Sequence, residues 1–124
     1  MQSDDHSMPS RGSGANDEHG HGSHVAGLAV GNQTGVAKRA KVIAVKVMNG
    51  NGGGYFSDVV RGLEFVLERK LNSPGTAMTV FMSLGGRSTM QSMEVAINNL
   101  LDAGIVSVVA AGNANIDACQ FCPA

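Results

Sequence analysis

Three histidines separated by glycine and serine stand near the start of the chain, in the run His19-Gly20-His21-Gly22-Ser23-His24. Imidazole exchanges a proton near neutral pH, so one of these side chains could act as a general base. Small apolar residues follow, and their pattern over residues 25–30 predicts a short buried helix. Glycine lets the backbone approach closely at such a point. The run therefore predicts a histidine held at a loop-to-helix junction.

The elements that must position these residues follow from the apolar pattern. Three apolar runs predict buried strands of a parallel sheet, over residues 41–47, 78–84 and 105–111. Apolar residues at helical spacing lie between consecutive runs from residue 57 onward, so the pattern predicts an α/β fold with a parallel sheet and helices on both faces. Ligands bind at the carboxyl ends of such strands. Ser83-Leu84-Gly85 and Ala111-Gly112-Asn113 lie where two strands end, so we expect them to share one rim.

Composition limits the classes of protein to consider. With 124 residues, 43% of them hydrophobic and 15% charged, the chain is expected to form one globular domain. A net charge of −1 offers no basic surface for nucleic acid and no polybasic membrane signal, and no apolar run approaches the length of a membrane span. Residues 1–18 are polar, which predicts a mobile leader or surface loop and no signal peptide. We expect the folded domain over residues 19–124.

Four segments in order resemble the motifs of the subtilases, the subtilisin-like serine proteases, and most closely their proteinase K branch. They are residues 19–27 (HGHGSHVAG), residues 35–37 followed by 42–47, residues 83–86 and residues 109–113. The resemblance covers roughly residues 19–124. It implies an incomplete subtilisin-like three-layer sandwich. It also implies a secreted or extracellular serine endopeptidase that acts on protein or peptide substrates.

The same resemblance assigns roles to particular residues. It implies that His21 is the catalytic base and that Asn113 donates to the oxyanion. His24 corresponds to the second histidine of the motif, which packs within the helix, and His19 is an additional, exposed histidine. The substrate cleft that it implies is made by Gly52, Gly53, Gly54 and Phe56 on one wall, by Ser83, Leu84 and Gly85 on the other, and by Ala110, Ala111 and Gly112 in the pocket.

Two members of the family's Asp-His-Ser triad have no counterpart in these 124 residues. No Asp-Thr/Ser-Gly motif precedes His21, and no Gly-Thr-Ser-Met-Ala motif follows it. Asp17, four residues before His21, does not have the form of the aspartate motif. We therefore interpret the chain as an internal fragment of a serine endopeptidase that is inactive alone. The aspartate strand of the family lies between the strands that resemble residues 41–47 and 78–84, so the sheet should have a gap or another pairing there.

Two other functions remain open at this point. A non-catalytic, peptide-binding pseudoenzyme would use the same cleft without hydrolysis. A zinc-binding protein would use His19, His21 and His24 with Cys119 and Cys122, although this histidine spacing matches no standard finger. The two cysteines are otherwise free thiols or members of a disulfide. No cofactor is evident: full-length relatives often bind calcium, but no segment here offers a convincing set of oxygen ligands. The oligomeric state is not predicted.

Overall fold

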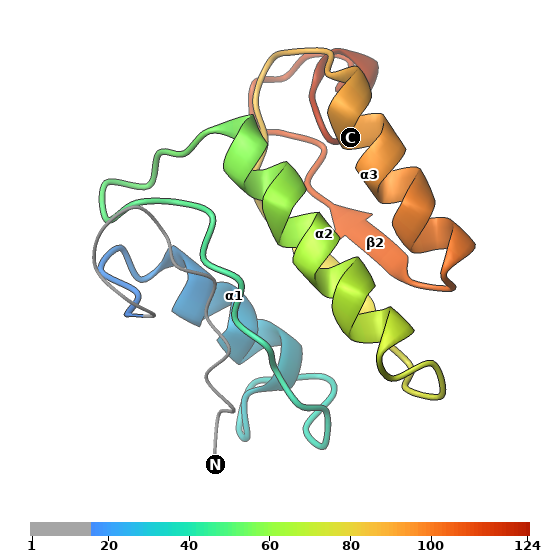
Figure 1. Ribbon diagram of the computed structural model, residues 1–124. Coiled ribbons are helices and arrows are strands. Elements are labelled where there is room, and N and C mark those ends of the chain that lie inside the picture. The colour runs from blue at the N-terminus through green and yellow to red at the C-terminus, as the bar shows by residue number, and fades with distance from the viewer. Residues whose placement is uncertain (1–15) are drawn as a thin grey trace. The chain divides into compact units, whose positions relative to one another are not determined.

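The computed structural model describes residues 16–124 and contains three α-helices, two strands and one 3₁₀ helix in that range (Figure 1). In chain order they are α1 (His21–Val30), α2 (Phe56–Leu71), β1 (Thr79–Met82), α3 (Gln91–Asp102), β2 (Val106–Val109) and η1 (Ala118–Gln120). The chain divides into two compact units, with the boundary between Gly62 and Leu63 inside α2. Residues 1–15 of the leader predicted for residues 1–18 lie outside the described residues.

Helix α1, in the first unit, ends in a tight glycine turn. The Gly31 N–H donates to the Gly27 carbonyl at 2.9 Å, and the Gly35 N–H donates to the Gly31 carbonyl at 2.8 Å. A Cβ atom at Gly35 would lie 2.1 Å from the Gly31 nitrogen, so only glycine fits this turn. The predicted helix forms, but Val30 is its one buried residue. The expectation of a buried helix is therefore wrong for most of α1.

The apolar run over residues 41–47 forms no strand, so this part of the prediction is wrong. A strand requires a ladder of hydrogen bonds, and no neighbouring strand pairs with the run among residues 16–124. The run packs instead, because the side chains of Val45 and Val47 lie against Gly62 of α2. A Cβ at Gly62 would lie 2.8 Å from Val47 Cγ1 and 3.1 Å from Val45 Cγ1. A gap or another pairing is expected beside this run, and no pairing of the run is found among residues 16–124.

The second unit is built on the parallel pair β1 and β2, with α3 between them in the chain (Figure 1). The register pairs Thr79 with Val106 and Met82 with Val109. Helix α3 packs against β2, and its buried side chains are Met93, Ala96 and Leu100. The predicted order of strand, helix and parallel strand is confirmed over residues 78–111, with shorter strands than expected. Methionines serve as core residues here, as their spacing suggests.

One face of this two-stranded sheet carries exposed apolar side chains. Phe81 and Val108 are register partners and are 57% and 46% exposed, and Val106 on the same face is 58% exposed. Met82, whose side chain points to the opposite face, is 4% exposed. Burial of the strands on both faces, which the apolar runs predict, is therefore not found in the described residues. No helix among them is long and apolar enough to cross a bilayer.

Candidate active site

His21 is the first residue of α1 and is exposed. Gly20 before it is in the left-handed region at φ 89°, which turns the loop into the helix. The first helical hydrogen bond runs from the His24 N–H to the Gly20 carbonyl at 3.0 Å. The predicted loop-to-helix junction is thus confirmed. It places one imidazole at the start of α1 and the next, His24, one turn further along.

Asp17 binds the free backbone N–H groups at this junction. Its carboxylate accepts hydrogen bonds from the backbone N–H groups of His19, Gly20 and Ser23 and from the Ser23 hydroxyl. The Ser23 hydroxyl, followed by the Gly20 and Ser23 N–H groups, holds the pKa of the Asp17 carboxyl well below its usual value. Asp17 is therefore a carboxylate that caps the helix carrying His21.

The glycine-rich loop that follows residue 48 is a defined turn. The Asn49 side-chain oxygen accepts from the N–H groups of Asn51 and Gly53 at 3.0 and 3.2 Å. Gly52 adopts φ +77°, and a Cβ there would lie 2.7 Å from His19 Nε2. The ring of His19 is in turn 6.3 Å from that of His21, centroid to centroid, in an edge-to-face arrangement. The first unit thus brings both the candidate base and Gly52 of one candidate cleft wall close to His19.

His19 is exposed, as expected, but it is not remote from the candidate site. The sequence contains no signal that His19 lies close to Gly52, because the loop that carries Gly52 is about 30 residues away in the chain. The other members of this wall are Gly53 and Gly54 in the same turn, and Phe56 at the first position of α2. A Cβ at Gly54 would lie 2.6 Å from the Val47 carbonyl oxygen, so Gly54 holds the loop against the preceding chain.

The second unit brings the other two candidate segments together. Because Met82 and Val109 are register partners at the ends of β1 and β2, Ser83–Gly85 and Ala110–Gly112 leave the sheet side by side. The Ala110 N–H continues the ladder by donating to the Met82 carbonyl at 3.1 Å. The expectation of a shared rim is confirmed. Asn113 follows directly, exposed, at the end of the second segment.

The ring of Phe121 lies between the two segments, and the sequence prediction missed it. A Cβ built on Gly85 would meet the Cε1 edge of the ring at 2.5 Å, and one built on Gly112 would meet the Cδ2 edge at 3.1 Å. The chain around Phe121 is anchored at Gly86, which exchanges two backbone hydrogen bonds of 2.9 Å with Cys122. Glycine on each side of the ring is thus a packing requirement. In the sequence the only trace of this contact is the pair of glycines.

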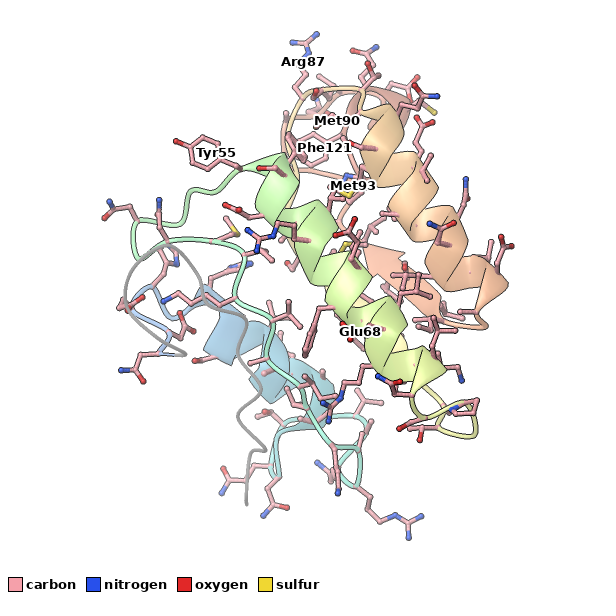
Figure 2. All side chains as sticks on the ribbon, viewed as in Figure 1. Tyr55, Glu68, Arg87, Met90, Met93 and Phe121 are labelled. Carbon is pink, nitrogen blue, oxygen red and sulfur yellow. The ribbon has the colours of Figure 1, made fainter. Side chains whose placement is uncertain are left out.

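A small pocket of about 70 Å³ lies beside the start of α3, and the side chains of Met90, Met93 and Phe121 line it together with Cys122 (Figure 2). Burial, followed by the nearby charge of Glu94, raises the pKa of the Cys122 thiol. A thiol of this kind stays protonated near neutral pH and is a poor nucleophile. Both cysteines are free in the structure. The cavity is therefore a packing feature of the segment that carries Phe121.

No cluster of three or more His, Cys, Asp or Glu side chains within residues 16–124 is arranged to hold a metal ion. The zinc hypothesis, which needs His19, His21 and His24 with both cysteines, finds no such ligand set in the described residues. The two carboxylates that precede these histidines are engaged elsewhere, since Asp17 caps α1 and Glu18 pairs with Lys46. Of the predicted site residues, His21 has an exposed imidazole that can transfer a proton, and Asn113 has an exposed amide that can donate a hydrogen bond.

The chain is similar in sequence and in structure to known proteins. The sequence profile described as "Subtilase family" matches residues 2–121. The chain is 43% identical over 120 residues to the subtilisin-like serine protease Pen ch 18 of Penicillium rubens, which covers 92% of this chain and 24% of that protein. It is 43% identical over 114 residues to the subtilase-type proteinase psp3 of Schizosaccharomyces pombe, covering 91% of this chain and 25% of that protein.

A solved structure shows the same fold. It is the crystal structure of a cold adapted subtilisin-like serine proteinase, with a TM-score of 0.79 and 35% sequence identity. The match covers 87% of this chain and 38% of the other. The chain thus has a mixed α/β fold with parallel strands that matches part of a subtilisin-like structure. It spans about a quarter of the length of the curated relatives, which are 24% and 25% covered.

Proposed function

Because the chain belongs to the subtilase family of serine proteases, we propose that it carries the general base and one oxyanion donor of an endopeptidase acting on proteins or peptides. The observation that carries this proposal is the position of His21. Its imidazole is exposed on the first residue of α1, next to His19 and the Gly52 turn. A base needs access to the substrate and a fixed backbone, and this junction offers both.

In the proposed reaction, His21 takes the proton of a serine hydroxyl as that oxygen attacks the substrate carbonyl. The protonated imidazole then gives the proton to the leaving amine. The Asn113 side-chain amide donates a hydrogen bond to the oxygen that becomes negative in the tetrahedral intermediate. Asn113 suits this role because it follows Gly112 at the carboxyl end of a parallel strand pair, where the chain leaves the sheet.

The rim of the second unit would hold the substrate. The backbone of Ser83–Gly85 continues from β1 and would pair with an extended peptide as an added strand. Ala110–Gly112 continues from β2 and would line the pocket for the side chain that precedes the scissile bond. Phe121 lies between these two segments, so its ring would restrict the depth of that pocket. Gly52–Gly54 and Phe56, in the first unit, remain proposed as substrate-binding residues.

The 124 residues contain neither the aspartate motif nor the serine motif of the family. We therefore expect residues 1–124 alone to be inactive and the native protein to hydrolyse peptides only where both motifs are supplied. Removal of one catalytic partner already costs several orders of magnitude in rate. Secretion of the native protein, which family resemblance implies, stays a prediction.

Peptide hydrolysis by the native protein tests the proposal. His21→Ala should lower kcat/KM by roughly 10⁴-fold or more, because the base is lost. Asn113→Ala should lower it by about 10²- to 10³-fold, because one oxyanion donor is lost. Asn98→Ala, on the exposed side of α3, is the matched control and should leave the rate unchanged. Unchanged hydrolysis in His21→Ala would refute the proposal, and peptide binding without hydrolysis by the native protein would identify a pseudoenzyme instead.

A further inference from the structure

The carboxylate of Asp17 accepts hydrogen bonds from the backbone on both sides of His21. Its Oδ1 accepts from the N–H of His19 at 3.2 Å and of Gly20 at 2.7 Å. Its Oδ2 accepts from the N–H and from the hydroxyl of Ser23, each at 2.7 Å. One side chain thus fixes the two residues before His21 and the second residue after it. The Cα atom of His21 lies inside this closed loop.

Helix α1 needs such a cap because its own cap position has no side chain. The cap residue is Gly20, and the N–H groups of the first turn have no partner within the helix. Ser23 is the third helical residue, whose N–H is the usual target of a capping oxygen. Asp17 reaches it from three residues upstream of the cap position. A carboxylate is also favoured there by the positive end of the helix dipole.

Asp17 is itself held in place from a different part of the chain. The Lys46 ammonium donates to the Asn16 carbonyl at 2.7 Å and forms an ion pair with Glu18. Lys46 thus binds the residues immediately before and after Asp17. Glu18 also lies close to the glycine turn, because a Cβ at Gly50 would approach Glu18 Cβ to 3.1 Å. The chain on both sides of Asp17 is thus held in place, independently of the four hydrogen bonds that its carboxylate accepts.

We propose that Asp17 is a positioning residue for the general base, which it orients by tying Gly20 and Ser23 to one carboxylate. The inference rests on the proposed function, since it concerns the role of His21 as base. The low pKa of Asp17 supports it, because the carboxylate keeps its charge and its four donors at every pH at which an imidazole base works. Asp17 acts through the backbone and makes no contact with substrate in this role.

The test uses variants of the native protein and counts active sites with a serine-directed fluorophosphonate. Asp17→Ala removes all four contacts and should lower kcat per active site by about 10- to 100-fold, with KM within about twofold, because a small displacement of a base slows chemistry more than binding. Asp17→Asn keeps one acceptor oxygen and should restore part of that loss. Asp58→Asn, which removes the same charge from the first turn of α2, is the control and should behave as the native protein.

Two NMR signals separate positioning from mere folding. In Asp17→Ala the Ser23 amide should exchange faster and the His21 ring resonances should shift, while the amides of α3 keep their native protection. Native kcat per active site and unshifted His21 resonances in Asp17→Ala would overturn the inference. Failure of the proposed function is recognised separately, because it is measured with His21→Ala alone. The ring resonances report the position of His21 whether or not the protein hydrolyses peptides.

Discussion

At the scale of single residues, the ring of Phe121 limits the size of the chain's own residues at positions 85 and 112. It occupies the space beside Gly85 and Gly112, so neither position has room for a methyl group without a shift of the ring or of the backbone. Gly112 has a second constraint, its φ of +90°. The left-handed region costs an L-residue about 1–2 kcal/mol. Sterics and backbone conformation thus act together at Gly112.

Gly104 provides a control that separates the two effects. It has φ +76°, but within the described part of the chain nothing lies within 4 Å of its Cβ position. Gly104→Ala should therefore lower the free energy of unfolding by about 1 kcal/mol from backbone strain alone. Gly112→Ala should cost about 1 kcal/mol more, because the methyl group also overpacks against Phe121. Chemical denaturation of the two variants measures the difference. In a Phe121→Ala background the two costs should become equal, and an unchanged difference there would argue against the ring contact.

The Asp17 cap has a defined pH dependence. Its carboxyl pKa is lowered in the folded protein from an unfolded value near 3.9, so the cap stabilises the native state above that pH and is lost as the pH falls through the lower folded value. The Ser23 amide resonance should therefore stay in its native position at pH 4 and move only under stronger acid. NMR titration measures this. A midpoint at or above pH 3.9, or the same titration in Asp17→Asn, would show that the carboxylate does not cap α1.

At the scale of elements, packing rather than pairing explains residues 41–47. The apolar run that predicts a strand finds no ladder partner among the described residues, and its Val45 and Val47 side chains pack on Gly62 of α2. Glycine inside a helix is ordinarily unfavourable by about 0.5–1 kcal/mol relative to alanine. Its presence at Gly62 is explained by the two valine side chains. Among the described residues, these side-chain contacts hold the segment to the first unit.

This explanation makes opposite predictions for two helical glycines. Gly27, within α1, has no atom of residues 16–124 within 4 Å of its Cβ position, so Gly27→Ala should stabilise the fold by about 0.5–1 kcal/mol. Gly62→Ala should instead destabilise it by about 1 kcal/mol or more, because its methyl group would lie 2.8 Å from Val47. Thermal or urea unfolding of both variants measures the signs. Stabilisation by Gly62→Ala would mean that the valines do not pack there.

At the scale of the whole molecule, sequence patterns predict the local elements better than the contacts between distant segments. The α/β order and the rim formed after β1 and β2 follow from apolar runs and from the geometry of parallel strands. The contacts of Phe121 with Gly85 and of His19 with Gly52 join residues about 30 or more positions apart, and no periodicity encodes them. Burial is also overestimated, because the apolar runs do not show that one face of the β1–β2 sheet is uncovered.

The motif residues behave differently from the remainder of the chain. The run around His21 combines a glycine junction, a helix start and an imidazole, so the local structure could be predicted from six residues. The cap that supports it could not, because Asp17 precedes the run in a polar stretch without a recognisable pattern. Candidate catalytic positions can therefore be proposed from a motif, whereas the residues that hold them require the structure.

Labelling of the native protein with a fluorophosphonate is the most direct test of the central claim, that His21 is the base of a serine endopeptidase. The probe reacts only with a serine whose hydroxyl is activated by a neighbouring base. Our account predicts one labelled serine per molecule in the native protein, and labelling that is slowed by orders of magnitude in His21→Ala. A native protein that resists the probe, or a His21→Ala variant that reacts at the native rate, would contradict it.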